Sequence, residues 1–263
     1  MYYGIQLSVS GILTSSYRTD ALANNLANAN TTAFKPVSAI AKQREAVRVE
    51  DGVAHLPSNA MLERLGAGAH PAANRTEFTQ GAIQRTGGDL DLAIQGDGFF
   101  VLRDSSDQAT DALRLTRDGR MLRNADGTLV HAQSGLPVLD ANGNTINVPQ
   151  RGPGGADVTI DDRGNIRIGG RRVAQVEFVD IPDQDRLERI GRTLYQPTAQ
   201  QLDSATPATG RIEQGAVEAS AVDPITAMMG VTDAAGAIST NTRMVDFQDR
   251  MIDQAINTFG RSS

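Results

Sequence analysis

The sequence predicts an α+β protein in which an N-terminal and a C-terminal helix flank an inserted, mainly antiparallel β-domain. Apolar side chains recur at alternating steps of three and four residues at both ends of the chain, in residues 5–26 and 228–259. Such steps place a narrow seam on one side of a helix, as in coiled coils. Short β-prone segments and turn signals fill the region between them. We therefore expect the terminal helices to pair with each other and with those of further copies.

Composition excludes several classes of protein. Aromatic residues make up 4% of the 263 residues and Trp is absent, so Val, Leu, Ile and Ala must supply the core. The net charge of −6, without a basic block, argues against nucleic acid as a partner. The lack of Cys excludes disulfides and thiolate metal sites. Residues 1–7 carry neither a positive region nor a long apolar stretch, and no run of 18 apolar residues exists. We thus expect no cleaved secretory signal and no membrane span.

The first segment, residues 1–35, is expected to be an axial helix with an Asn-rich motif. The helix is predicted over residues 3–29, because asparagines tend to end helices and Pro36 disfavours helix before it. Its seam runs through Ile5, Val9, Ile12, Ser16, Thr19, Ala23 and Leu26. The next segment, residues 36–86, is predicted to be an extended arm or loop. Its residues 37–48 could be helix or extended, and the rest is irregular and polar.

Residues 87–215 are expected to form the β-rich middle domain. Leu90, Leu92 and Ile94 alternate with polar or small residues, and Phe99–Leu102 reads as a buried strand. Turn signals recur at Asp118-Gly119, Asp126-Gly127, Ser134-Gly135, Asn142-Gly143, Arg163-Gly164-Asn165 and Gly169-Gly170. Val173–Ile181 is predicted to be one long alternating strand, and residues 183–215 to be loops and short strands.

The last segment, residues 216–263, is expected to be the C-terminal axial helix, with Pro224 at its first position and Gly260 at its end. Gly230 and Gly236 each weaken a helix by about 1 kcal/mol relative to Ala. The seam of this helix runs through Met228, Val231, Ala235, Ile238, Thr242, Val245, Asp249, Ile252, Ile256 and Phe259.

Structural roles explain the histidines, the Gly-Asp-Gly segment and the Asp140–Asn144 segment better than chemical roles do. The three histidines, His55, His70 and His131, share no helix or hairpin spacing and are expected to be exposed or in loops. Gly96-Asp97-Gly98 lacks the third glycine and the following helix of a phosphate loop, so a turn is expected. Asp140–Asn144 lacks the acidic residue that closes a calcium loop, so an Asn-Gly hairpin turn is expected.

A pair of carboxylates for glycan cleavage could be drawn from Asp89, Asp91 and Asp97. No cleft is indicated around them, and a solvated strand face explains them better. The sequence therefore predicts no catalytic residue, no cofactor and no metal site.

Residues 23–35 read Ala-Asn-Asn-Leu-Ala-Asn-Ala-Asn-Thr-Thr-Ala-Phe-Lys, which resembles the signature of the flagellar axial proteins of the bacterial rod and hook. Residues 79–100, 115–139 and 214–223 resemble the same family in the same order. The residues that match the Asn-rich motif are Asn24, Asn25, Leu26, Asn28, Thr31, Phe34 and Lys35. The resemblance spans nearly the whole chain.

The resemblance implies a non-enzymatic structural subunit that leaves the cell interior through the flagellar export apparatus, without signal cleavage, and reaches the basal body in the periplasm. Its partners would be itself, other rod and hook proteins and the export apparatus. Leu26 and Phe34 would be buried anchors, and the amides would bond within or between subunits. The expected assembly interface consists of Ile5, Val9, Ile12, Asn24, Asn25, Leu26, Asn28, Phe34, Met228, Val231, Ile238, Val245, Ile252, Ile256 and Phe259.

Within the family, the chain length and residues 56–71 most resemble the distal rod members, with the proximal rod as the alternative and the longer hook protein less similar. The last helix departs from the family, because residues 230–238 lack the Arg, aromatic and Glu usual there. Two other functions stay open: a peptidoglycan-cleaving enzyme that accompanies the rod, and an export chaperone or cap-like protein.

Overall fold

The computed structural model describes residues 3–45, 49, 52, 66, 68–104, 112–149 and 158–259. The chain divides into two compact units. One, here called the helix unit, combines Met1–Ala27, Val37–Thr76 and Asp223–Ser263. The other, the β unit, combines Asn28–Pro36 and Glu77–Val222. Terminal helices around a mainly antiparallel β region confirm the predicted α+β class.

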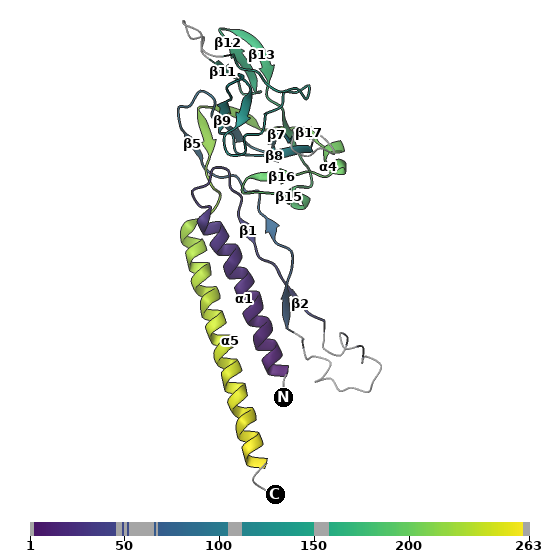
Figure 1. The fold of residues 1–263 in the computed structure, drawn as a ribbon, viewed down its shortest axis with the longest axis vertical. Helices are drawn as coiled ribbons and strands as arrows, with labels where there is room; N and C mark the ends of the chain where they lie inside the picture. Colours follow the sequence, from purple (N-terminus) through teal and green to yellow (C-terminus); the bar gives the residue numbers. More distant parts are fainter. Residues whose placement is uncertain are drawn as a thin grey trace. The chain divides into compact units, whose positions relative to one another are not determined.

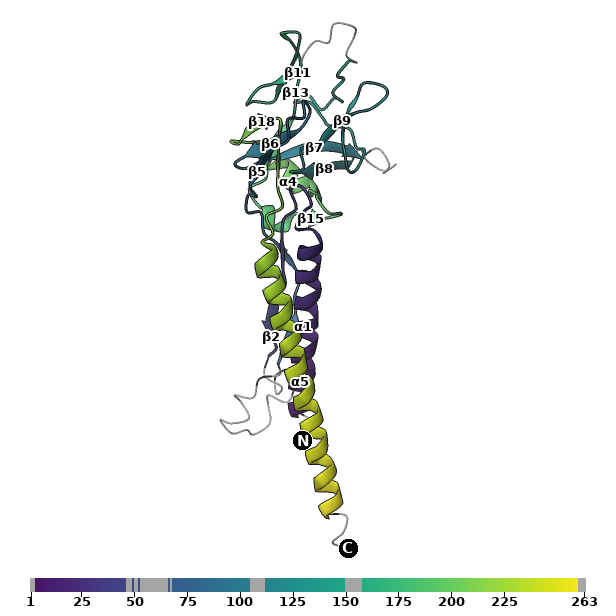
Figure 2. The ribbon, with the colours of Figure 1, turned by 90° about the vertical axis from the view of Figure 1, so that its left-hand side faces the viewer.

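Two helices form most of the helix unit. Helix α1 (Tyr3–Ala27) and helix α5 (Pro224–Phe259) lie side by side and run in opposite directions (Figures 1 and 2). Helix α5 begins at Pro224, as predicted, and Asp223 Oδ1 accepts a hydrogen bond from Ile225 N at 3.0 Å, which caps its first turn. The capping carboxylate and the fixed φ of proline explain why the helix begins here.

Three glycines define how α1 and α5 face each other. A methyl group placed on Gly4 would meet the Gln248 side chain, and one on Gly11 would lie 2.9 Å from Asn241 Nδ2. One on Gly230 would lie 2.9 Å from Leu22 Cδ1. From one contact to the next, α1 advances by the same number of residues as α5 retreats, so one antiparallel register holds along the whole pair. Small residues at these positions permit the helices to approach closely.

Residues 37–43 and 69–76 of the helix unit form a two-stranded arm. Strand β1 (Val37–Ser38) pairs with β4 (Arg75–Thr76), and β2 (Ala41–Gln43) pairs with β3 (Ala69–Pro71). Residues 37–43 thus take the extended alternative of the two that the sequence allowed. Ser10 Oγ donates to Ala69 O at 2.5 Å and accepts from Ala69 N at 2.8 Å, which ties the arm to α1. Most of residues 56–71, the segment resembling the distal rod members, lies outside the described residues.

A six-stranded sheet forms the centre of the β unit, in the order β15-β16-β8-β7-β14-β17. Its strands are β7 (Phe99–Asp104), β8 (Ala112–Thr116), β14 (Phe178–Asp180), β15 (Glu188–Arg189), β16 (Leu194–Gln196) and β17 (Thr206–Pro207). Phe100 and Leu102 of β7 pack into one hydrophobic cluster, and Phe99 and Val101 pack into another. Burial of both faces explains the uninterrupted apolar run that predicted this strand.

Three two-stranded sheets and one three-stranded sheet make up the other described strands of the β unit. They are formed by β5 (Ile83–Arg85), β6 (Leu92–Gln95), β9 (Met121–Arg123), β10 (Leu129–His131), β11 (Val158–Ile160), β12 (Asn165–Ile168), β13 (Arg171–Gln175), β18 (Arg211–Gln214) and β19 (Ala216–Glu218). The Asn142-Gly143 signal does form a tight turn, in which Gly143 has a φ of +78°. The Gly96-Asp97-Gly98 turn between β6 and β7 is also confirmed.

Three sequence expectations for the β unit are wrong. The single strand expected over Val173–Ile181 is split into β13 and β14, which belong to different sheets, because Val176 N bonds to Gly164 O in between. Gly119 is not a hairpin turn but a buried segment, where its missing side chain lets Leu92 O approach closely. A short helix, α4 (Ala199–Asp203), was also missed, although the capping box of Thr198 and Gln201 at its start is visible in the sequence.

Candidate assembly interface

The α1-facing side of α5 consists largely of small or polar residues. Ala227 and Ala234 are buried there, and Gly230, Asn241 and Gln248 lie against α1. Of the predicted seam, the half-buried members are Val231, Ile238, Val245 and Ile252. Met228 and Ile256 are 58% and 64% exposed, and the side chain of Phe259 lies outside the described residues. The predicted stripe therefore mixes residues of two helix faces.

The predicted stripe of helix α1 also mixes residues of two helix faces. Ile5, Ile12 and Leu26 are half-buried, whereas Val9 is 42% exposed. Leu13, which the sequence reasoning did not select, is 58% exposed. Every second member of the predicted α1 stripe thus lies outside the contact with α5.

A second apolar face runs along α5 and was missed. It consists of Ile225, Met229, Met244, Phe247 and Met251, all at least 47% exposed. At 100° per residue, Met229 and Phe247 are in line and the other three fall within about 60° of that line. This outer face lies roughly 120–160° around the helix from Ala227, Ala234 and Asn241. The residues form two groups, Ile225 with Met229 and Met244 with Phe247 and Met251, and the polar or small residues Asp233, Gly236 and Thr240 lie between the groups on the same face. The steps of three, four and seven residues within the groups are visible in the sequence, but they overlap with those of the predicted stripe.

Asn25 of the Asn-rich motif makes its hydrogen bonds within the chain. Its Nδ2 donates to Val37 O at 2.9 Å, and its Oδ1 accepts from Val37 N at 2.8 Å. The buried amide therefore fixes the start of β1 beside the end of α1. Asn24, by contrast, is exposed.

The second half of the motif belongs to the β unit. Asn28 is buried and its Oδ1 accepts from Thr31 Oγ1 at 3.1 Å. Ala33 adopts a φ of +53°, unusual for a residue with a side chain, and its N donates to Glu218 O at 2.7 Å. Phe34 is 1% exposed and packs under the Arg189 guanidinium, whose carbon lies 4.7 Å from the ring centre.

Lys35 ends the motif inside a fully buried ion cluster. Its Nζ lies 2.5 Å from Glu218 Oε1 and 2.6 Å from Thr79 O. Glu218 also accepts from Arg117 Nε at 3.0 Å and from Gly81 N at 2.8 Å. Burial lowers the pKa of Lys35 to about 8, although the attraction of Glu218 acts in the opposite direction. Glu218 thus connects its own segment, residues 216–222, to residues 28–36, to residues 77–81 and to Arg117.

A second buried carboxylate lies at Asp118. His131 Nε2 and Arg120 Nη2 lie 3.3 Å and 3.1 Å from its Oδ2. Burial opposes ionisation of Asp118, but the bonds from His131 and Arg120 outweigh it and lower the pKa of this carboxyl. His131 is 0% exposed, so the expectation of an exposed or loop histidine is wrong for it; His70 on β3 is exposed, and His55 lies outside the described residues. Ser134 Oγ lies 2.8 Å from His131 Nδ1 and accepts from Leu136 N, so both side chains hold the turn after β10.

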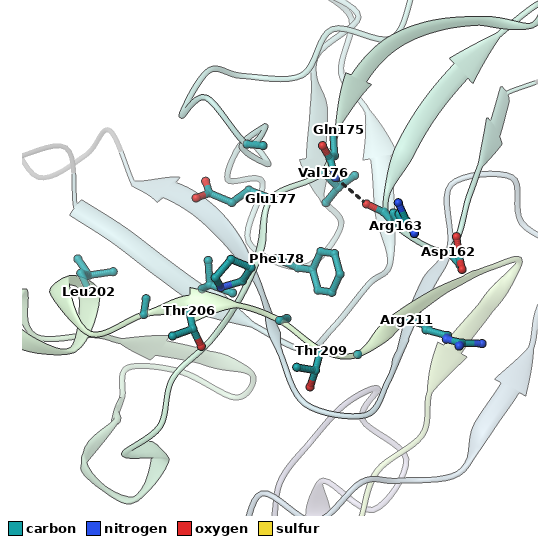
Figure 3. A pocket seen from close by; sticks show the side chains of 16 residues that line it. Asp162, Arg163, Gln175, Val176, Glu177, Phe178, Leu202, Thr206, Thr209 and Arg211 are labelled. Atoms are coloured by element: carbon teal, nitrogen blue, oxygen red, sulfur yellow. Dashed lines mark hydrogen bonds between the residues drawn. The ribbon is translucent and has the colours of Figure 1, made fainter.

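One cleft of the β unit measures about 720 Å³ and lies between the start of β14 and the segment around β17 (Figure 3). Phe178 lies near its centre, with Glu177, Arg163 and Arg211 around it. Burial and the charge of Asp140 raise the pKa of Glu177. Both basic side chains, Arg163 and Arg211, and acidic side chains, Asp162 and Glu177, line the cleft. It contains none of the three aspartates considered for glycan cleavage.

Those three aspartates differ in their surroundings. Asp91 Oδ2 accepts from Thr86 Oγ1 at 2.5 Å, while Asp89 and Asp97 are exposed. The calcium-like segment uses its carboxylate internally, because Asp140 Oδ1 accepts from the backbone N of Asn142 and Asn144. Among the described residues no group of three acidic or histidine side chains could hold a metal ion.

Comparison with known proteins shows to which class of protein the chain belongs. Residues 5–35 match the flagella basal body rod protein family, residues 93–168 the flagellar hook protein FlgE/F/G D1 domain, and residues 213–258 the flagellar basal body rod FlgEFG protein C-terminal family. The matches place the chain among the axial proteins of the bacterial flagellum. They fall on α1 with the motif, on the β unit, and on β18 through α5.

Three similar proteins show which members of this class the chain resembles. The chain is 32% identical over 98% of its length to the flagellar basal-body rod protein FlgF of Caulobacter vibrioides, of which it covers 98%. It is 27% identical to the rod protein FlgG of Bacillus subtilis, over 98% of the chain and 99% of the relative. It is also 27% identical to FlgF of Mesorhizobium japonicum over the full length of both. The chain belongs to the flagellar basal-body rod protein family.

The protein is therefore a structural subunit of the flagellar basal-body rod, and it associates with other axial components of the flagellum. Within the described residues, no helix has both the length and the hydropathy required to cross a membrane. Relatives named FlgF and FlgG match over similar lengths, so its place within the rod stays a prediction.

Proposed function

We propose that this rod subunit assembles with further copies and with other axial proteins through the exposed faces of its helix unit, and that the resulting helical array transmits torque. The observation that carries the proposal is the second apolar face of α5. Within the described residues α1 covers the side with Ala227 and Ala234, while the side with Met229 and Phe247 stays open to solvent. Exposed apolar patches of this kind, here one around Met229 and one around Phe247, mark interaction sites.

Helix α1 supports the same proposal. Val9 and Leu13 are exposed although they carry large apolar side chains. Of the expected interface residues, Val9, Met228 and Ile256 lie on such open surface, while Ile5, Ile12, Val231, Ile238, Val245 and Ile252 support the contact of the two helices with each other. Asn25, Asn28 and Phe34 hold the chain where it leaves α1.

The route to the rod is proposed from the family resemblance. The subunit would pass through the flagellar type III export apparatus without cleavage, take a place in the distal rod, and act without catalytic activity. Mass spectrometry of fractionated basal bodies tests the position and the uncleaved start together. Recovery of the chain in the proximal rod fraction, or with a shortened N-terminus, would contradict the respective part.

Deleting residues 1–30 should abolish incorporation into basal bodies. A sharper test uses Leu13→Ser and Phe247→Ser, which change exposed positions and should leave the monomer folded. Leu122→Ser is the matched control, because Leu122 is 56% exposed on the β unit. We expect the two helix variants to fail in co-sedimentation with basal bodies and the control to assemble. Normal assembly of both helix variants would refute the proposal, and a band in a zymogram with purified protein would refute the non-enzymatic role.

A further inference from the structure

The methionines of this chain are distributed unevenly. Of the seven, Met228, Met229, Met244 and Met251 lie on α5 and are 47–63% exposed. Met121 is 2% exposed in the core of the β unit, and Met1 and Met61 lie outside the described residues. The chain contains no Cys, so thioethers are its only sulfur groups. The oxidisable sulfur of the described residues is therefore concentrated on one helix.

The same thioethers form most of the outer face of α5. Met229, Met244 and Met251 share that face with Ile225 and Phe247, and Met228 lies at its border, about 100° from Met229. Methionine is flexible and polarizable, which suits a surface that must fit neighbours of differing shape. Oxidation makes the same side chain polar and disrupts interfaces rich in methionine.

We propose that the outer face of α5 is a methionine oxidation site at which peroxide controls assembly of the rod subunit. The inference rests on the proposed function and takes a second copy of this chain as the neighbour that packs against this face. In the reaction, a lone pair of the thioether sulfur attacks one oxygen of the peroxide. An S–O bond forms and the O–O bond breaks, and the departing oxygen takes up the proton of the attacked oxygen and leaves as water. The sulfur loses two electrons, and the peroxide gains them.

The two states of the subunit should differ in sensitivity. Before assembly the four thioethers are open to solvent, so peroxide reaches them. After assembly a neighbouring helix covers them, and oxidation should slow. A sulfoxide formed before assembly would place a polar S–O group into an apolar contact, where it lacks a hydrogen-bond partner. Oxidation would thus block addition of new subunits while leaving finished rods intact.

The experiment treats the purified full-length chain with hydrogen peroxide and follows each methionine by mass spectrometry. We expect Met228, Met229, Met244 and Met251 to gain one oxygen at least about tenfold faster than Met121, which serves as internal reference. Circular dichroism should show that the helices persist. Treated protein should lose at least about tenfold in co-sedimentation with basal bodies, and methionine sulfoxide reductase should restore it. Unchanged assembly of the fully oxidised chain, or loss that the reductase does not reverse, would overturn the inference.

A variant in which all four methionines are changed to Leu removes the sulfur and keeps an apolar side chain at each position, because Leu is close to Met in volume and helix propensity. This variant should assemble before and after peroxide treatment, and assembly lost on treatment would contradict the role of the thioethers. Should the variant not assemble, reversal by the reductase in the wild-type chain decides the question. The untreated wild-type chain tests the proposed function itself, so failure there is distinguishable from failure of the oxidation site.

Discussion

Lys35 and Glu218, which are far apart in the sequence, form an ion pair of 2.5 Å between two side chains that are both 0% exposed. Arg117 shares the same carboxylate at 3.0 Å, so the cluster holds two cations around one anion. The three partners are therefore not equivalent. Loss of Glu218 leaves two buried cations together, whereas loss of Lys35 leaves a matched pair.

This asymmetry predicts an order of stabilities. Glu218→Gln should lower the free energy of unfolding of the β unit by about 3–5 kcal/mol, because unpaired buried charge is costly. Lys35→Met should change it by about 1 kcal/mol or less, because Arg117 still neutralises Glu218. Urea unfolding followed by circular dichroism measures both. Arg85→Ala is the control, since its ion pair with Glu213 has an 87% exposed arginine and should matter little. Equal effects of Glu218→Gln and Lys35→Met would contradict the cluster as described.

The pKa of Lys35 predicts a dependence of stability on pH. Burial lowers this pKa to about 8 in the folded chain, against 10.5 for the free side chain. Between these values the unfolded chain binds more protons than the folded chain, so the free energy of unfolding rises with pH. Below about pH 8 Lys35 is charged in both states and contributes no slope. Glu218 and Arg117 are the charged groups that face it.

The wild-type chain and Lys35→Met should therefore diverge in alkaline solution. From pH 8 to about pH 9.5, the wild type should gain roughly 1–2 kcal/mol relative to the variant. Urea unfolding of both chains in the same buffers gives the difference. Parallel curves over this range would mean that Lys35 keeps its proton in the folded chain.

The amide of Asn25 should contribute measurably to the helix unit. Asn25→Ala leaves Val37 N and Val37 O without their side-chain partner, at a cost of about 1–3 kcal/mol. Amide hydrogen exchange should become faster at Val37 and along the end of α1. Asp20→Ala is the matched control, because Asp20 is exposed on the same helix. Similar protection in both variants would contradict a structural role for Asn25.

The two glycines of the unusual region in α5 should respond in opposite ways. Gly236→Ala should stabilise the monomer by about 1 kcal/mol, because nothing lies within 4 Å of the added methyl group and Ala favours helix. Gly230→Ala should gain less or destabilise, because the methyl group would lie 2.9 Å from Leu22 Cδ1. Thermal unfolding of the two variants tests the sign. A larger gain for Gly230→Ala would mean that Leu22 yields without cost.

Much of the helix unit could be predicted from local pattern. The proline at position 224 gave the start of α5, and the steps of three and four residues gave the helices. It was harder to predict which residues of α5 face α1. Ala227, Ala234 and Asn241 face α1, one residue before the predicted Met228, Ala235 and Thr242. Small side chains give no hydrophobic signal, so a contact built from them is visible only once the partner helix is placed.

The ion cluster could not be predicted for a different reason. Lys35, Arg117 and Glu218 come from three segments without a common local pattern, and only the folded chain brings them together. The turn at Asn142-Gly143 needed no such information, because the left-handed backbone of Gly143 is a local requirement.

The constant register between α1 and α5 restricts how the lengths of these helices can change. Removing one residue from either helix would rotate all that follows by about 100° and bring bulky side chains where glycines now meet the partner. Removing residues 12–18 together with residues 234–240 would excise facing stretches of equal length and preserve the encounter of Gly4 with Gln248. Insertions and deletions in one terminal helix should therefore be tolerated only when the other terminal helix changes by the same whole number of heptads.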